Sequence, residues 1–354
     1  SKVDPGRSLV FTRNPDYWGK DLAVNRGRNN FNSVTYVYYR DATVAFEGFK
    51  AGQYDFRAEN RAKTWATEYS FPAAKQGLVK RLEQAHQNSS GMQGFAFNLR
   101  KPIFQDVRVR EALGYAFDFE WSNRTLFNMA YARTNSFFAN SELAAKGNPS
   151  KEELALLSPL RKQVPAAVFG AVWQPPKTDG SGNARGNLLK AQQLLASAGW
   201  TMRNGKLVDK QGQPFAFEIL LAQPEFERIV QPFRQNLARL GVDMKIRMVD
   251  VSQYVERVRR FDYDMTVANF PQSQSPGNEQ QDFWSSKAAD TQGSRNIIGI
   301  KNPAGDALSQ KIIGAPSRTE LIAATRALDR VLLANHYVIP QFHVNNYRLA
   351  YWDI

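Results

Sequence analysis

The amino-acid sequence predicts an α/β fold whose main sheet is rich in parallel strands. The stretch 215–268 alternates apolar strand patterns with amphipathic helix patterns in the order β-α-β-α-β. This order is typical of parallel strands joined by right-handed helical crossovers. A further strand–helix unit occupies 91–118. Ligands of such sheets bind beyond the carboxyl ends of the strands, so we expect a site there.

The first 85 residues predict a smaller α/β unit. Its expected strands lie at 34–41, 54–59 and 77–83, and its expected helices lie at 42–53 and 61–75. The local sequence offers no partner for all the faces of these elements. We therefore expect sheet edge or apolar surface in this unit that a separate segment would cover.

The unit at 91–118 begins with a strand in which Phe95, Phe97 and Leu99 alternate with smaller or polar residues. A helix follows from Asp106, whose carboxylate is a good N-cap and suits the positive end of the helix dipole. Its apolar residues recur at helical spacing and predict one buried face.

The three strands of the central unit are expected at 215–221, 242–249 and 263–268. The helix between the first two ends at Gly241, a typical C-terminal cap, and a second helix spans about 252–260. The sequence from Ser317 to Glu320 matches a capping box and opens another helix. The stretch 136–186 is rich in Pro, Gly, Ser and Asn, and predicts a loop within the same domain.

Length and composition limit the classes of protein. The chain has 354 residues, which suggests two lobes or a part of something larger. Lys plus Arg exceed Asp plus Glu by 46 − 33 = 13, but no run of five basic residues occurs, which favours a solvated basic surface. The absence of cysteine excludes disulfides, thiolate metal sites and a cysteine nucleophile.

The sequence gives little support to catalysis. Its three histidines lack metal-ligand spacing, and neither a GxSxG elbow nor a phosphate-binding GxxxxGK[ST] loop occurs. A non-catalytic, cofactor-free protein is therefore the preferred interpretation. Two alternatives stay open: a hydrolase that uses Glu279 and Asp282 as acid and base, and a nucleic-acid-binding protein, which would need one clustered Lys/Arg face.

A polar, proline-bracketed loop at 269–282 directly follows the last expected parallel strand. Its amide and acid side chains can donate and accept hydrogen bonds at the edge where ligands of such sheets bind. A second polar loop at 293–296 could face the same place. Both loops are therefore predicted to line a ligand cleft.

Several motifs, in order along the whole chain, resemble the oligopeptide and dipeptide substrate-binding proteins of ABC importers, which form extracellular solute-binding protein family 5, cluster C. The motifs at 13–19 (RNPDYWG) and 95–118 (FAFNLRKPIFQDVRVREALGYAFD) resemble the family in general. Those at 275–280, 293–296, 327–333 and 347–353 resemble its YejA-like branch.

The resemblance implies a periplasmic protein of the two-lobed type II fold that delivers extended oligopeptides to an inner-membrane ABC permease as a monomer. Peptide antibiotics of the microcin C type are among the implied ligands, and neither nucleic acid nor a cofactor is implied. The first lobe would comprise 1–88 and 346–354, with lobe two at 89–345. Lobe one would be incomplete, because the chain resembles a fragment without the family's N-terminal part and extreme C-terminus, and a separate segment of the same protein could pair with it.

The resemblance also implies a ligand site. Family members hold the ammonium of the peptide with an aspartate at the position that Asn269 occupies here, so Glu279 or Asp282 would have to supply the charge. The strand at 91–99 is expected to offer backbone hydrogen bonds to an extended peptide. The expected ligand-binding residues are Gln93, Phe95, Phe97, Asn269, Phe270, Pro271, Asn278, Glu279, Gln280, Asp282, Ser294, Arg295 and Asn296.

Overall fold

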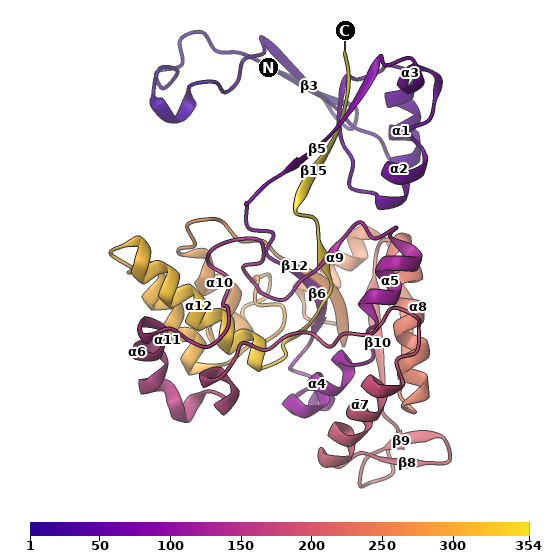
Figure 1. Ribbon diagram of the computed structural model, residues 1–354, viewed down its shortest axis with the longest axis vertical. Coiled ribbons are helices and arrows are strands. Elements are labelled where there is room, and N and C mark those ends of the chain that lie inside the picture. Colours follow the sequence, from indigo (N-terminus) through magenta and orange to yellow (C-terminus); the bar gives the residue numbers. More distant parts are fainter. Residues whose placement is uncertain (354) are drawn as a thin grey trace. The chain divides into compact units, whose positions relative to one another are not determined.

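The computed structural model describes residues 1–353 and divides the chain into two units. One comprises Ser1–Gln84 with the end of the chain from Tyr347, and the other comprises Ala85–Asn346. Each unit combines helices with sheets, which confirms the α/β class (Figure 1).

A five-stranded sheet forms the centre of the larger unit. Its order is β11 (Asp243–Met248), β10 (Ala216–Leu221), β12 (Met265–Phe270), β6 (Met92–Phe97) and β13 (Val338–Pro340). β10 pairs in parallel with both β11 and β12, which confirms that the three strands of the β-α-β-α-β unit are parallel. β6 is antiparallel to β12 and to β13. The parallel strands therefore all end at one edge of the sheet, where a ligand site is expected.

Parallel pairing is less common than the sequence predicts. In the larger unit, two small ribbons, β7–β14 and β8–β9, are antiparallel. Their strands are β7 (Ala132–Arg133), β14 (Phe342–His343), β8 (Thr201–Arg203) and β9 (Lys206–Val208). The strands that helical crossovers connect are therefore parallel, as expected. Hairpins and the strands that return to the sheet from elsewhere in the chain form antiparallel pairs.

Helices cover the sheet of the larger unit (Figure 1). The capping signals of three of them are confirmed: Asp106 and Ser317 accept hydrogen bonds from the first turns of α4 and α12, and Gly241 follows α8 with a positive φ of 77°. The helices are α4 (Val107–Gly114), α5 (Phe119–Leu126), α6 (Lys151–Leu157), α7 (Arg185–Ser197), α8 (Pro224–Arg239), α9 (Val251–Arg259), α10 (Glu279–Trp284), α11 (Pro303–Ile313) and α12 (Arg318–Ala334).

The prediction of a loop over 136–186 is wrong in part. This stretch contains α6 and two 3-10 turns at 158–163 and 166–169. Ser150 caps α6, and its buried Glu153 pairs with Arg330 of α12. The Pro- and Gly-rich sequence around α6 led to the prediction of a loop, although the helix itself has a local cap and is also held by tertiary contacts.

Arg330 and Glu153 form an ion pair inside the larger unit. The Arg330 Nε lies 2.5 Å from the Glu153 Oε2, and their side chains are only 1% and 3% exposed. The guanidinium also donates to the carbonyl oxygens of Lys146, Gly147 and Gly170. One buried cation thus joins α12, α6 and the chain before and after α6.

Two titratable groups nearby have pKa values that differ between the folded and unfolded states. Burial raises the pKa of the Asp329 carboxyl from 3.8 to about 6, although Ser136 and two backbone N–H groups donate to it. Burial, aided by the positive charge of Arg110, lowers the pKa of His336 from 6.5 to about 4.

These shifts have opposite effects on stability. The stability linked to Asp329 is complete below its unfolded-state pKa and is lost as the pH rises through 6. The stability linked to His336 is complete above pH 6.5 and is lost as the pH falls through 4.

We expect Asp329→Asn to leave the effect of His336 on stability unopposed. Between pH 6.5 and 4 its free energy of unfolding should then fall by roughly 2–3 kcal/mol more than that of the wild type. Denaturant titrations at several pH values test this, and parallel curves would contradict it.

The smaller unit contains two sheets. In one, β15 lies between β4 and β5 and is antiparallel to β4; in the other, β1, β2 and β3 are antiparallel. Phe46, Phe49, Trp65, Tyr69 and Val79 form the core of this unit. Its elements are β1 (Lys2–Asp4), β2 (Ser8–Thr12), β3 (Ser33–Val37), α1 (Ala42–Lys50), β4 (Phe56–Ala58), α2 (Ala62–Thr67), α3 (Pro72–Lys75), β5 (Val79–Ala85) and β15 (Asn346–Trp352).

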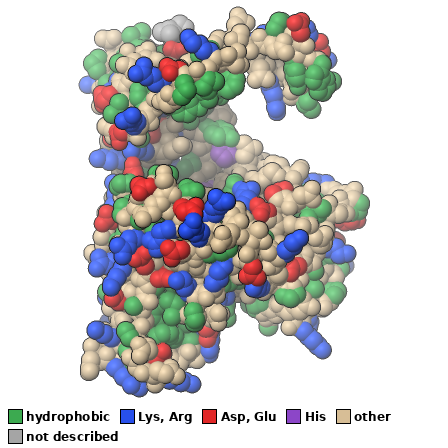
Figure 2. All heavy atoms as spheres, turned by 180° about the vertical axis from the view of Figure 1, so that it is seen from behind, with side chains coloured by type: hydrophobic (Ala, Val, Ile, Leu, Met, Phe, Trp, Pro, Cys, Tyr) green, Lys and Arg blue, Asp and Glu red, His purple; other side chains and the backbone are tan. Residues whose placement is uncertain are grey.

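The sheet of β1, β2 and β3 contains no buried residue among those strands. Large apolar side chains are exposed on it and on the chain between β2 and β3, including Phe11, Trp18, Phe31 and Tyr36. Figure 2 shows hydrophobic side chains gathered on the surface of the smaller unit. An apolar surface of this kind is typical of a contact face.

Basic and acidic side chains are interspersed over the face of the larger unit in Figure 2. This mixture is typical of a solvated surface and differs from the single basic face that a nucleic-acid-binding protein would need. Within residues 1–353, no helix combines the length and the apolar character that crossing a membrane requires.

Candidate functional site

A pocket of about 500 Å³ lies in the larger unit where the strands β10 and β12 end. It is bounded by 220–223 and Phe226 at the end of β10, by 267–270 of β12, and by Phe283, Ser294, Arg295 and Ile297. Val251, Tyr254 and Val255 of α9 complete the wall. Most of these side chains are apolar, and the polar groups are few, as in typical small-ligand sites.

Helix α9 is a wall of the pocket, but none of its residues is buried. Polar contacts attach it to the sheet instead. The Tyr254 hydroxyl lies 2.9 Å from the Thr266 hydroxyl and donates to the carbonyl oxygen of Val267. Val251 and Val255 remain 64% and 57% exposed, so their side chains are free to contact a ligand.

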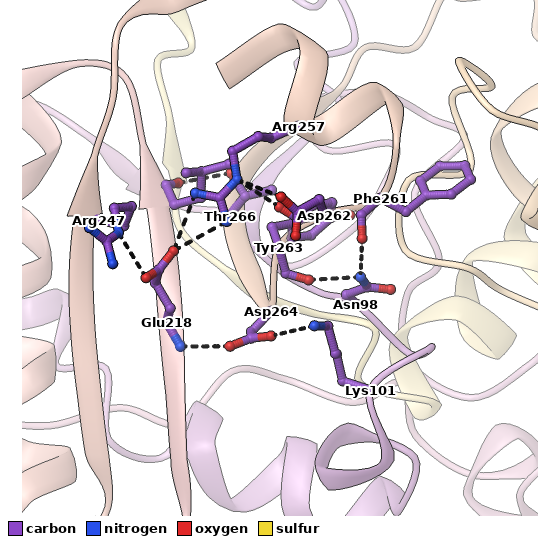
Figure 3. A network of polar contacts seen from close by, with 11 residues as sticks. Asn98, Lys101, Glu218, Arg247, Arg257, Phe261, Asp262, Tyr263, Asp264 and Thr266 are labelled. Carbon is purple, nitrogen blue, oxygen red and sulfur yellow. Dashed lines mark hydrogen bonds and ion pairs between the residues drawn. The ribbon is translucent and has the colours of Figure 1, made fainter. Parts of the chain in front are cut away.

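Arg257 makes the second attachment of α9 (Figure 3). Its guanidinium lies 3.4 Å from the Glu218 carboxylate of β10 and 3.0 Å from the carboxylate of Asp262. Glu218 also pairs with Arg247 of β11, and Asp264 accepts from the backbone N–H of Glu218. This network spans the helix, the two neighbouring strands and the turn before β12.

We expect Arg257→Met to loosen α9 and thereby the wall of the pocket. The loss of charged hydrogen bonds at a half-buried site should lower the free energy of unfolding by about 1 kcal/mol and raise amide exchange across 251–259. Arg260→Met is the matched control, because Arg260 forms an exposed i,i+4 ion pair with Glu256. Equal exchange in both variants would contradict this role of the network.

The loop before Ile297 is held from within by Asn296. This fully buried amide donates to the carbonyl oxygens of Ser285 and Ile300 and accepts from the backbone N–H groups of Gly299 and Ile300. The Ser294 hydroxyl donates to Ala288. The loop is thereby fixed, and its neighbouring residues Ser294 and Arg295 are presented to the pocket.

Four of the expected ligand-binding residues come together at the pocket: Asn269, Phe270, Ser294 and Arg295. Asn269 is exposed and Phe270 is buried. Asn269 and Phe270 were expected in a loop but form the last two residues of β12, whereas Ser294 and Arg295 lie in the second expected loop. All four remain in the proposed site.

The other residues of the polar loop do not line the pocket. Pro271, Asn278 and Asp282 are exposed, whereas Gln280 is fully buried and bonds to Gln272 and to the indole of Trp284. The Glu279 carboxylate closes its own turn by accepting from the backbone N–H of Gly277. The loop thus packs largely on itself.

The expectation that β6 binds a peptide needs correction. β6 is paired on both sides, with β12 and with β13, so 94–96 has no free strand edge. Phe95 and Phe97 are fully buried, stacking against Phe233 and packing on Phe104 respectively. Gln93 donates to the side chain of Gln341. These two phenylalanines therefore belong to the core and not to the proposed site.

The part of the pocket formed by 220–223, Phe226 and α9 was not predicted from the sequence. A signal was present, because Val251, Tyr254 and Val255 place three large side chains at helical spacing after a strand. The helix at about 252–260 was predicted, but none of its residues was assigned to a ligand site. For residues 1–353, no group of three or more acidic or histidine side chains could hold a metal ion.

The fold and the pocket together are typical of one class, the α/β binding proteins, in which ligand sites lie beyond the ends of parallel strands. The family model "Bacterial extracellular solute-binding proteins, family 5 Middle" matches residues 1–292. The chain therefore belongs to family 5 of the bacterial extracellular solute-binding proteins.

Its relatives agree with this assignment. The chain is 47% identical over 354 residues to the probable peptide-binding protein YejA of Agrobacterium fabrum, a match that covers 99% of this chain and 58% of that protein. The chain thus spans somewhat more than half the length of this relative. Since the family comprises solute-binding proteins and not enzymes, the comparisons do not support a hydrolase that uses Glu279 and Asp282.

Solved structures share the fold. The oligopeptide-binding protein AppA of Bacillus subtilis, solved with a nonapeptide, matches with a TM-score of 0.73 and 20% identity, over 100% of this chain and 61% of AppA. NikZ of Campylobacter jejuni, solved with Ni(L-His), matches with a TM-score of 0.74 and 16% identity, over 100% of this chain and 62% of NikZ. The fold is thus that of two-lobed periplasmic binding proteins.

Proposed function

We propose that the protein captures extended oligopeptides for an ABC importer. The observation that carries this proposal is the pocket at the ends of β10 and β12. Its apolar walls suit a peptide side chain, and the amide of Asn269 and the guanidinium of Arg295 suit polar groups at its rim. The peptide-binding name of the YejA relative and the nonapeptide in AppA support the same ligand class.

In this proposal, residues 1–88 and 346–354 belong to lobe one and residues 89–345 to lobe two. Closure of the lobes about a hinge would trap the peptide, and a monomer in the periplasm would deliver it to an inner-membrane permease. A further segment of the same protein would cover the exposed faces of the sheet formed by β1, β2 and β3. The length of the YejA relative leaves room for such a segment.

The fold alone does not determine the ligand, because AppA was solved with a nonapeptide and NikZ with Ni(L-His). An apolar pocket favours a peptide over a metal chelate. Peptide antibiotics of the microcin C type are oligopeptides and fall within the same class.

Calorimetry with defined probes tests the proposal. We expect pooled peptides of three to nine residues, a range that includes the nonapeptide length of AppA's ligand, to bind with a Kd of about 1 μM or tighter. An oligosaccharide and a nickel–histidine complex serve as controls and should not bind. Binding of a control together with failure of all peptides would overturn the proposal.

A further inference from the structure

The side chains that line the pocket carry a positive charge and no negative charge. Arg295 is the one charged side chain among the residues that line it. Asn269, exposed at the end of β12, is neutral. The acidic residues of the neighbouring loop do not line the pocket, so the pocket offers a cation and amide groups but no carboxylate.

Arg295 is held in place without being neutralised by an ion pair. Its guanidinium lies over the ring of Phe283, 4.0 Å from the ring centroid, and Phe283 itself is buried. Within the described part of the chain, 1–353, no carboxylate forms an ion pair with this guanidinium. The nearest acidic contact is made by the backbone, since the N–H of Arg295 donates to the Asp282 Oδ1 over 3.3 Å.

A free ammonium would be poorly accommodated in this pocket. It would meet the positive charge of Arg295, and no carboxylate would compensate for the loss of its hydration. A carboxylate, by contrast, can accept hydrogen bonds from the guanidinium and from the Asn269 amide. Hydrogen bonds between charged groups are stronger than those between neutral ones, and a guanidinium matches the planar geometry of a carboxylate.

We propose that this pocket receives the carboxyl-terminal residue of the peptide. Its α-carboxylate binds Arg295 and the Asn269 amide, and its apolar side chain packs between α9 and Phe226. The ligand's amino terminus lies elsewhere, so the site does not distinguish a free from an acylated amino group. This inference rests on the proposed function, and it reverses the expectation that this region holds an ammonium.

The test uses the full chain and four forms of one tetrapeptide, Ala-Ala-Ala-Leu. These are the free peptide, its carboxyl-terminal amide, its N-acetylated form, and the peptide carrying both caps. We expect amidation to weaken binding by about tenfold or more, as the loss of a charged hydrogen bond implies. N-acetylation should leave the affinity within about twofold.

Two variants connect the effect to the residues. Arg295→Gln should remove the difference between acid and amide, whereas Arg203→Gln, a change at an exposed arginine of β8, should preserve it. Asn269→Asp should weaken binding of the free acid and make a free amino group favourable, as in the family members with aspartate at this position. Melting curves check that each variant folds.

The outcomes separate the two proposals. Tight binding of all four forms with no effect of amidation would overturn this inference and leave peptide capture intact. A loss of binding on N-acetylation alone would also overturn it. If no form binds and the peptide pools also fail, the proposed function falls, and this inference falls with it.

Discussion

Replacing Arg330 by methionine should lower the free energy of unfolding of the larger unit by about 3–5 kcal/mol, the usual cost of leaving one partner of a buried ion pair alone. Methionine keeps the apolar stem of the side chain but leaves the Glu153 carboxylate, 3% exposed, without its cation. Three backbone carbonyls also lose their donor. Chemical denaturation followed by circular dichroism measures the change.

Arg326→Met is the matched control for this prediction. Arg326 lies one turn earlier on the same helix and is exposed where it donates to the carbonyl oxygen of Glu142, so its loss should change stability by less than about 1 kcal/mol. Replacing Arg330 and Glu153 together by apolar residues should recover part of the loss, because no buried charge is then unpaired. Equal, small effects of Arg330→Met and Arg326→Met would show that the buried pair does not hold α6 in place.

Replacing Val255 by tryptophan should reduce peptide affinity by about a hundredfold or more without unfolding the protein. Val255 lines the pocket on α9, so an indole there would occupy the volume proposed for a ligand side chain. The lost apolar contact and the steric clash together correspond to about 3 kcal/mol or more of binding energy. Calorimetry with the best peptide of the pool gives the affinity.

Val44→Trp provides the control for this substitution. Val44 lies on α1, is 57% exposed like Val255, and lies outside the pocket. The same change there should leave both affinity and melting temperature close to those of the wild type. If Val255→Trp binds peptide as tightly as Val44→Trp does, the pocket is not the place where the peptide binds.

Much of the larger unit could be predicted from its sequence. The β-α-β-α-β periodicity predicted three parallel strands, and the caps at Asp106, Ser317 and Gly241 were visible because capping depends on residues close in sequence. The strand-end rule also led to Asn269 and to the loop with Arg295. These features depend on local patterns and on a general property of parallel sheets.

Other features depend on contacts between distant residues. Helix α6 is tied to the rest of the unit by Glu153 and Arg330, which are 177 residues apart. Its Ser150 cap is a local signal, but the Pro- and Gly-rich sequence around the helix led to the prediction of a loop. Asn296 was predicted to be a polar loop residue that binds the ligand, but it is fully buried. Its amide forms hydrogen bonds with backbone groups of Ser285 and Ile300 on both sides of the loop. Phe95 was assigned to the ligand site because it lies on the strand at 91–99 that was expected to bind a peptide, yet tertiary packing places it against Phe233.

The sign of the charge at the pocket could not be predicted for a similar reason. Glu279 and Asp282 lie within the expected ligand loop at 269–282, and this suggested that they face the ligand. In the structure Glu279 closes its own turn, and Asp282 accepts from the backbone of Arg295. Side-chain direction within a loop depends on its hydrogen bonds, which spacing alone does not reveal.

The central claim is that the pocket at the ends of β10 and β12 binds a peptide. Mass spectrometry of the small molecules that co-purify with the protein, released by denaturation, tests it most directly. The account predicts peptides in the wild-type preparation and their loss from an otherwise folded Val255→Trp preparation. A co-purified solute that is not a peptide, or peptides retained equally by both proteins, would contradict it.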